Sequence, residues 1–225
     1  MADDESKNKP KKTVNTGRIR RERKAAILAA AEKAFALNGF KGTSTSSIAK
    51  AAGLGKAQLH YYFPSKSDLY QELLLSIMEQ WNCTLENITA EDDPAEVLRE
   101  YICAKLRLSW DRPELSKIFA GEVLRGAPVL QEYCFEQQRA WLAHKSDVFK
   151  CWIDAGKMDP IDPVQLIFMI WSVTQHYADY QAQVLGLMNQ KALSEEHFVC
   201  VSEQVVQIIF KGCGIDASSY SKQKT

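Results

Sequence analysis

The sequence lacks the cysteine spacings that metal sites and redox centres use. Its 225 residues include six cysteines, and none of them belongs to a Cys-x-x-Cys pair. A zinc knuckle or a redox dithiol needs such closely spaced thiols. We therefore expect no metal ligands and no cofactor, and we interpret the cysteines as reduced thiols that pack as small apolar side chains.

Long apolar runs are also missing. No stretch of 18 or more apolar residues occurs, and the first residues are charged rather than apolar. A transmembrane helix needs about 20 apolar residues, and a secretory signal needs an apolar segment close to the N-terminus. We expect a chain without a membrane span or a signal peptide, located in the cytoplasm.

The net charge of zero conceals an asymmetry along the chain. Residues 1–66 carry 14 lysines and arginines against 5 acidic residues, whereas residues 67–225 carry 14 against 23. A basic segment is suited to phosphate binding, and an acidic segment is not. The asymmetry favours a nucleic-acid-binding part followed by a part with another task, although many basic segments are solvated tails.

The stretch 43–66, TSTSSIAKAAGLGKAQLHYYFPSK, has the pattern of a helix-turn-helix. A first short helix reaches Gly53, which tolerates the positive φ of a sharp turn. A second places Leu59 inward and ends before Pro64, because the residue before a proline avoids the α region. The outward face of the second helix is short, polar and aromatic: Ala57, Gln58, His60 and Tyr61. These residues favour a helix that enters a DNA groove over an ordinary helical hairpin.

Apolar residues elsewhere recur at spacings of three and four, and no segment alternates with the period of a strand. We predict an all-α fold of about nine helices, with an N-terminal three-helix DNA-binding domain and a C-terminal helical domain for ligand binding and dimerisation. The long helices are predicted over 65–88, from Pro128 to about 155, and over 163–187, the last apolar on nearly all sides. The predicted segments are a disordered basic arm over 1–21, the DNA-binding domain over 22–66, the helical domain over 67–213 and a disordered tail over 214–225.

The segment RIRRERK over 18–24 adds five cations in front of the helix-turn-helix. It is either a solubilising tail or an arm that contacts phosphates or an adjacent minor groove. The residues alone leave both interpretations open.

Residues 22–72 resemble the DNA-binding domain of the TetR family of bacterial transcriptional regulators. The elements Gly-Phe-x-Gly-Thr, which ends at Thr43, and Tyr-Phe-x-x-Lys, which ends at Lys66, carry the resemblance. It implies a homodimer that binds a near-palindromic operator on double-stranded DNA, represses transcription, and leaves the operator when a small molecule binds.

The resemblance also implies roles for individual residues. Thr43 and Ser44 cap the helix that braces the motif, and Ala57 and Gln58 face base edges, where a Gln amide can bond adenine bidentately. Tyr61 and Lys66 hold phosphates. Lys56 and His60 complete the predicted DNA-binding set, although the family often has an aromatic or aliphatic residue at the position of His60. Gly55 stands where a serine cap is frequent, which predicts a looser start for the recognition helix.

The C-terminal part resembles one branch of the family, the regulators of pyrimidine utilisation. The segments YICAKLRLSWDRPELSKIFAGEVLRGAPVL and KMDPIDPVQLIFMIWSVTQHYADYQAQV carry this second resemblance. For that branch the implied effector is uracil or thymine.

A nucleobase site needs an aromatic wall and a few matched polar groups. Trp171 and Gln175 share a helical face, and a Gln amide complements an imide edge. The predicted ligand-binding residues are Trp81, Trp171, Gln175, His176 and Tyr177. The alternative is that the aromatics belong to the core or to a dimer interface, and that Gln175 is a satisfied buried amide. Phe119 and Tyr101 are weaker candidates.

Two further readings remain open from the residues. His144/Asp147 and His176/Asp179 are pairs at i, i+3 that could relay a proton, but no nucleophile motif accompanies them, so we expect no catalytic residues. A regulator of the same fold could instead respond to an amphipathic ligand or to thiol oxidation. A thiol sensor needs an exposed cysteine with a low pKa.

Overall fold

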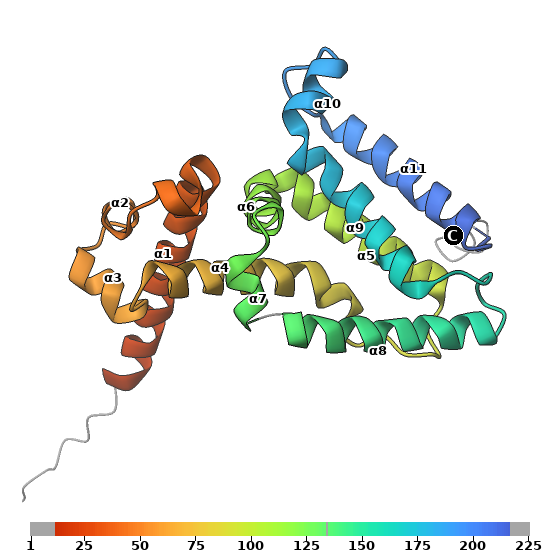
Figure 1. Cartoon of the computed structure of the whole chain (residues 1–225), viewed down its shortest axis with the longest axis horizontal. Coiled ribbons are helices and arrows are strands. Elements are labelled where there is room, and N and C mark those ends of the chain that lie inside the picture. Colours follow the sequence, from red (N-terminus) through yellow and green to blue (C-terminus); the bar gives the residue numbers. More distant parts are fainter. Residues whose placement is uncertain (1–11, 134, 217–225) are drawn as a thin grey trace, which may run out of the picture. The chain divides into compact units, whose positions relative to one another are not determined.

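The computed structural model describes residues 12–133 and 135–216, and that part of the chain is helical, without a strand (Figure 1). The helices in chain order are α1 (Lys12–Gly42), α2 (Thr45–Ala51), α3 (Lys56–Tyr62), α4 (Lys66–Asn82), the short 3-10 helix η1 (Cys83–Leu85), α5 (Pro94–Asp111), α6 (Pro113–Leu124), α7 (Pro128–Tyr133), α8 (Phe135–Asp154), α9 (Pro163–Asp179), α10 (Gln181–Leu187) and α11 (Glu195–Gly212). The chain divides into two compact units between Leu73 and Leu74. The division therefore falls inside α4, whereas the sequence placed it after Lys66.

The predicted disordered arm requires a correction. α1 begins at Lys12, so residues 12–21 belong to a helix that continues through the basic segment. The remainder of the predicted arm, residues 1–11, and most of the predicted tail, residues 217–225, lie outside the described residues.

The N-terminal unit, residues 1–73, is built around the apolar stripe of α1. Ile27, Ala31 and Phe35 repeat every four residues and are buried. Gly39 has a φ of 65° and kinks α1, so that the Phe40 ring lies 6.1 Å from the Phe35 ring and 4.9 Å from the Tyr70 ring. This aromatic cluster fixes α4 against the end of α1.

The start of α4 is capped as its sequence predicts. The Ser65 backbone N–H donates to Asp68 Oδ2 at 2.9 Å, and the Asp68 N–H donates to Ser65 Oγ at 3.1 Å. Each side chain thus satisfies a backbone donor that the first turn of a helix leaves free. The capping box holds the first turn of α4 in place directly after the recognition helix α3.

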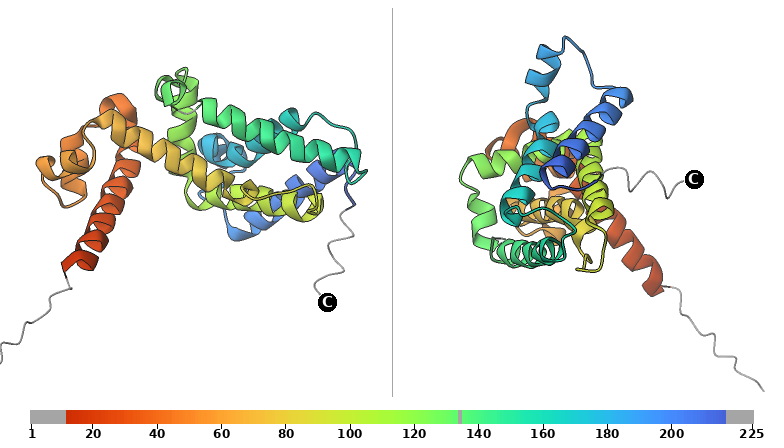
Figure 2. Two further views of the ribbon diagram at one scale, coloured as in Figure 1. Left: turned by 90° about the horizontal axis from the view of Figure 1, so that it is seen from below. Right: turned by 90° about the vertical axis from the view of Figure 1, so that its right-hand side faces the viewer.

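The C-terminal unit, residues 74–225, has a single large core. In Figures 1 and 2, α5 runs beside α9 and α11, and α8 closes the other side. Side chains from these helices and from η1 meet in the core, and the largest of them are fully buried: Tyr101, Phe149, Trp152 and Phe210. α5 begins at Pro94, whose missing N–H costs nothing at the first position of a helix.

Two of the predicted long helices are divided in the structure, which raises the count from about nine to eleven α-helices in the described part. The helix predicted from Pro128 is α7 followed by α8, and the helix predicted over 163–187 is α9 followed by α10. The second break lies at Tyr180, whose φ of −108° and ψ of 25° leave the helical region. The long helix predicted over 65–88 ends at Asn82 and continues as η1.

Candidate DNA-binding and ligand-binding sites

The recognition helix α3 presents the side chains that the sequence assigned to its outer face, except that His60 is half-buried. Leu59 and Phe63 are buried beneath it. Tyr61 is 71% exposed, and the remaining residues of the outer face are also exposed, namely Lys56, Ala57 and Gln58. Gly53, with a φ of 70°, forms the turn between α2 and α3. The unit therefore offers one short polar and aromatic helix face of the size that a major groove accepts.

Gln58 has a structural role that the sequence analysis missed. Its Oε1 accepts a hydrogen bond from the Gly55 backbone N–H at 2.9 Å. This bond caps the start of α3 from its third position, so the expected loosening at Gly55 does not occur. The amide nitrogen of Gln58 remains available to donate toward a base edge.

Thr43 and Ser44 differ in what they can offer to DNA. Ser44 is exposed, and its Oγ accepts from the Ser47 N–H at 3.0 Å, which is the predicted cap of α2. Thr43 is only 4% exposed, and its hydroxyl lies within hydrogen-bonding distance of the Gly39 and Ala34 carbonyls, at 2.8 and 3.0 Å. Thr43 therefore joins the end of α1 to α2 instead of facing DNA, which corrects its place in the predicted set.

Lys66 requires a second correction. Its ammonium donates to the Phe40 carbonyl at 2.8 Å and to the Thr43 carbonyl at 2.9 Å, and it lies 4.5 Å from the Phe40 ring centroid. A phosphate would have to compete with two carbonyls and an aromatic face for this cation. The structure gives Lys66 the role of joining the loop before α2 to the start of α4.

His60 is half-buried, and its Nδ1 lies 3.0 Å from the Pro64 carbonyl oxygen. A carbonyl can only accept, so Nδ1 carries the proton in this contact. The bond holds the end of α3 in place and does not use the other ring nitrogen, Nε2. His60 thus serves first as a local cap, and any contact with phosphate involves Nε2.

The N-terminal half of α1 adds cations to this unit. Arg18, Arg20, Arg21 and Arg23 are exposed, and the Arg20 guanidinium lies 6.0 Å from the Tyr61 ring centroid. Lys24 is paired with Glu72 at 2.5 Å. The contact between Arg20 and Tyr61 brings the basic segment beside the recognition helix, so both contribute to one positively charged surface.

The C-terminal unit contains a cavity of about 620 Å³ between α6 and α9 that includes two of the predicted ligand residues. Trp171 and Gln175 line it together with Asp179 from the same face of α9. The other lining residues are Lys117, Phe119, Ala120, Gly121, Val123, Leu124, Phe135 and Tyr180. An aromatic wall with an amide and a carboxylate close by can hold a flat ligand that carries hydrogen-bonding groups.

The structure separates the other three predicted ligand residues from this lining. Trp81 is buried and packs its ring at 4.8 Å from Phe119, so it supports a lining residue. Tyr177 lines a different cavity of about 290 Å³, beside Ser109 and Trp110. His176 is exposed and stacks on Tyr180 at 5.1 Å. The five residues do not form one constellation, because residues 176 and 177 point away from the face that 171 and 175 share.

Two polar residues beside the cavity were missed by the sequence analysis as ligand candidates. Asp179 lies at i+8 from Trp171, and its Oδ1 accepts from the Ser116 hydroxyl at 2.5 Å. Burial raises the pKa of Asp179 against the opposing effect of this hydrogen bond. Lys105 is the other: it falls on the apolar face of α5 and is 2% exposed. The same four-residue spacing that selected Gln175 could have identified Asp179.

Trp171 is fixed by its own hydrogen bond. Its indole N–H donates to the Tyr101 hydroxyl at 2.6 Å, and burial raises the pKa of that hydroxyl far above its usual range. Phe168 and Trp141 lie 5.5 and 6.3 Å from the Trp171 ring. The ring is therefore held as a rigid wall, and its N–H is not available to a ligand.

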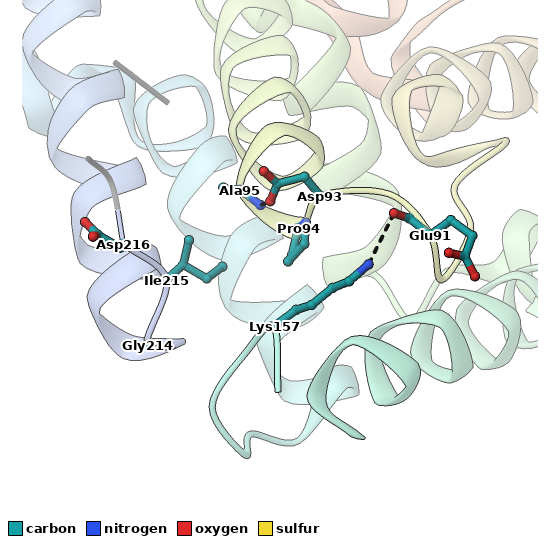
Figure 3. A pocket seen from close by; sticks show the side chains of 8 residues that line it. All are labelled: Glu91, Asp93, Pro94, Ala95, Lys157, Gly214, Ile215 and Asp216. Carbon is teal, nitrogen blue, oxygen red and sulfur yellow. Dashed lines mark hydrogen bonds between the residues drawn. The ribbon is translucent and has the colours of Figure 1, made fainter. Parts of the chain in front are cut away.

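A third cavity, of about 440 Å³, lies at the N-terminal end of α5, beside Pro94 and Ala95 (Figure 3). Figure 3 shows Lys157 reaching toward Glu91, and its ammonium donates to the carbonyls of Ala90, Glu91 and Asp92 at 2.9, 3.2 and 3.2 Å. The Lys157 ammonium is engaged by these three hydrogen bonds. Lys157 therefore joins the loop after α8 to the loop before α5.

Within residues 12–133 and 135–216, no three His, Cys, Asp or Glu side chains gather as metal ligands. The same part of the chain holds no helix that is long and apolar enough to cross a membrane. Of the two acid–histidine pairs, Asp147 pairs with Lys150 at 2.9 Å, and Asp179 accepts from Ser116. Both carboxylates therefore have other partners in the structure.

Comparison with known proteins agrees with this geometry. Residues 27–73 match the family model described as "Bacterial regulatory proteins, tetR family", and residues 74–216 match "YcdC-like protein, C-terminal region". The HTH-type transcriptional regulator RutR of Escherichia coli K12 is 40% identical over 190 residues, which cover 84% of this chain and 90% of RutR.

Solved structures share the fold at lower sequence identity. The ketosteroid transcriptional regulator KstR2 of Mycobacterium tuberculosis has a TM-score of 0.62 at 19% identity, covering 85% of this chain and 94% of KstR2. AibR, in complex with isovaleryl coenzyme A and operator DNA, has a TM-score of 0.62 at 17% identity, covering 84% of this chain and 98% of AibR. Together with the helix-turn-helix, these matches identify the chain as a member of the TetR family, a DNA-binding transcriptional regulator and not an enzyme.

Proposed function

We propose that the protein is a repressor that binds a near-palindromic operator as a homodimer and leaves it when a pyrimidine, uracil or thymine, binds to the C-terminal unit. The observation that carries the effector proposal is the cavity wall of Trp171 with Gln175 four residues later. The ring offers a stacking surface, and the amide offers one donor and one acceptor to an imide edge. The 40% identity to RutR supports the same assignment.

The DNA part of the proposal rests on α3 and α1. Tyr61 and Lys56 are exposed on α3 and suited to phosphate contacts, and the arginines of α1 extend that surface. Phosphate contacts fix the position of the protein on the duplex but do not distinguish one base sequence from another. Base reading falls to Gln58, through its free amide nitrogen, and to Ala57, which can touch a thymine methyl group.

The homodimer is supported by apolar side chains left exposed on the last long helices. Phe168 and Met169 on α9 are 43% and 53% exposed, and Val199 and Ile208 on α11 are 47% and 64% exposed. Adjacent apolar side chains exposed on long helices commonly mark a protein interface. A two-fold dimer places two copies of α3 on DNA, and their spacing must match one turn of the duplex, about 34–36 Å.

The test combines ligand binding with DNA release. Operator fragments are selected by the protein from a random DNA pool, and uracil, thymine, cytosine and adenine are then added at millimolar concentration. We expect uracil or thymine to raise the thermal midpoint and to abolish the mobility shift of the selected DNA, whereas adenine leaves both unchanged. If no pyrimidine changes either measurement, the effector proposal is wrong.

A second effector class is favoured by the size and lining of the cavity. Its volume of about 620 Å³ exceeds what one pyrimidine fills, and Phe119, Val123, Leu124 and Phe135 make much of its wall apolar. An amphipathic ligand would use that wall, so a medium-chain fatty acid and its coenzyme A thioester belong in the same panel. Burial raises the pKa of Cys103 and Cys213, which argues against these two thiols as sensors, whereas Cys83, Cys151 and Cys200 are exposed and keep the thiol-sensor alternative open.

A further inference from the structure

A buried lysine, Lys105, lies within the C-terminal unit close to the cavity lined by Trp171. Its side chain is 2% exposed and belongs to α5. The ammonium lies 4.4 Å from the Trp81 ring centroid, 5.8 Å from that of Tyr101 and 6.0 Å from that of Trp171. No hydrogen bond or ion pair of this ammonium occurs among the residues that the structure describes. Three aromatic rings surround a cation whose three donors are unused.

The other buried lysine of this unit is different. Lys145 on α8 is also 2% exposed, but its ammonium donates to the Glu86 carbonyl at 2.7 Å. Burying an ammonium without an acceptor is costly, and attraction to ring faces offsets only part of that cost. Lys105 is therefore the buried cation of this unit that lacks an acceptor within the described chain, whereas Lys145 has one.

The charged groups around Lys105 come from two other helices. On α9, Asp179 attracts the ammonium, and His176 acts on Asp179 in turn. On α6, Lys117 also acts on Asp179, while Ser116 donates to it. Burial lowers the pKa of Lys105 to about 7, against the smaller opposing effect of Asp179. The ammonium and the free amine are thus both present near neutral pH.

The position of Lys105 connects it to the cavity. Trp171 belongs both to the cavity lining and to the ring set around the ammonium, and Asp179 also lines the cavity. Trp81, the ring nearest to Lys105, packs against the lining residue Phe119. Lys105 itself is not among the residues that line the cavity, so an oxygen of a ligand stacked on the fixed Trp171 ring reaches the ammonium where the Trp81 and Phe119 rings shift.

We propose that Lys105 is a ligand-recognition residue that donates a hydrogen bond to a carbonyl oxygen of a flat cyclic amide or imide held against Trp171. This inference rests on the proposed function and adds the group that reads the ligand oxygen. The ammonium is the form that donates to this oxygen most strongly, so ligand binding stabilises the protonated state. Above pH 7 the ligand is bound together with a proton, and its affinity falls by at most about tenfold per pH unit.

The experiment is isothermal titration of the full chain with uracil at pH 8, in phosphate and in Tris, whose different ionisation enthalpies report proton uptake. We expect the wild-type protein to take up close to one proton per uracil. Lys105→Met should bind uracil at least about tenfold more weakly and without proton uptake. Lys145→Met is the matched control, because it removes a buried lysine that already has an acceptor, and it should keep both the affinity and the uptake.

Each outcome bears on a different statement. If uracil gives no heat and no thermal shift with the wild-type protein, the proposed function fails, and the role of Lys105 fails with it. If uracil binds without proton uptake, the role of Lys105 alone is wrong. Uptake that persists in a folded Lys105→Met variant assigns the proton to Asp179 or His176 and also overturns the proposal. Should that variant not fold, the wild-type affinity measured from pH 6.5 to 9 still decides, because a flat profile excludes the proton linkage.

Discussion

At the scale of single residues, Lys66 shows how a cation of the helix-turn-helix can serve the fold instead of the ligand. Its ammonium satisfies the Phe40 carbonyl at the end of α1 and the Thr43 carbonyl just before α2. We expect Lys66→Ala to lower the free energy of unfolding by about 1.5–3 kcal/mol, because two hydrogen bonds from a charged donor are lost. Urea unfolding followed by circular dichroism measures this loss.

Lys56 provides the matched control for Lys66, because it is an exposed lysine at the start of α3. Lys56→Ala should leave the free energy of unfolding within about 0.5 kcal/mol. It should instead reduce the dependence of log K on log salt by about 0.9, the contribution of one phosphate contact. If Lys66→Ala changes the salt dependence and leaves stability intact, the sequence-based role as a phosphate ligand is right and the structural role is wrong.

Gln58 combines a cap and a base contact in one side chain. Its oxygen caps Gly55, and its amide nitrogen is free. Gln58→Glu keeps the capping oxygen and adds a negative charge near a helix N-terminus, so we expect α3 to remain as stable as in the wild type. The lost N–H donor should change the base preference at one operator position by about 1–3 kcal/mol.

Gln58→Ala separates the two roles, because it removes the cap as well and should cost a further 0.5–1 kcal/mol or so of stability. Operator variants measured against both proteins identify the position that is read. An equal loss of affinity for every operator variant with Gln58→Glu would show that Gln58 reads no base.

At this scale, the sequence could predict the role of a side chain where its hydrogen-bond partners lie only a few residues away in the chain. The caps at Ser44 and Ser65 join residues three apart, and both were predictable from spacing. Lys66 finds its carbonyls 23 and 26 residues earlier in the chain, and Lys105 finds the rings of Trp81 and Trp171 on two other helices. No periodicity encodes those distances, so the sequence predicted a phosphate contact for Lys66 and missed the role of Lys105.

At the scale of elements, α1 is longer than the sequence indicated, and its first half carries the basic segment. Arg20, Arg21 and Arg23 are exposed on a helix, and Arg20 lies beside Tyr61 of α3. A helix holds its cations at fixed positions, so they contact phosphates at lower entropic cost than a disordered arm does. We expect the triple Arg→Gln variant to lower the slope of log K against log salt by up to about 2.7, three phosphate contacts at about 0.9 each.

The salt dependence is measured by fluorescence anisotropy of labelled operator between 50 and 300 mM salt. The matched control replaces Lys33 and Lys41, two exposed lysines in the second half of α1, with Gln. A slope that does not change with the triple variant would return residues 18–24 to the role of a solubilising segment.

The helix pattern was predictable where apolar periodicity is interrupted by glycine or proline, and less so elsewhere. Gly53 and Pro163 lie at the boundaries that the sequence indicated. The break between α9 and α10 lies at Tyr180, where neither residue type occurs and only the backbone angles depart from the helix. Such a break depends on tertiary packing, and the periodicity continues across it.

At the scale of the whole molecule, the proposed function depends on pairing two copies of the chain through α9 and α11. Met169 and Ile208 are 53% and 64% exposed on these helices. Exposure of apolar side chains to water is unfavourable, so an interface that covers them is stabilised by their burial. Met169→Glu combined with Ile208→Glu places two carboxylates in each half of that interface, where desolvation opposes association. We expect a monomer at micromolar concentration in sedimentation velocity, where the wild type sediments as a dimer.

The control for this variant is Leu37→Glu, an 83% exposed apolar residue of α1 that should leave the dimer intact. The monomeric variant retains the complete helix-turn-helix, so it should still bind a half-site, with a salt slope about half that of the dimer. Its affinity for the full operator should fall at least a hundredfold, because the second α3 is no longer held at the spacing of one DNA turn. A variant that remains dimeric would place the interface on other helix faces. A monomer with wild-type operator affinity would show that base contacts alone, rather than the distance between two recognition helices, determine specificity.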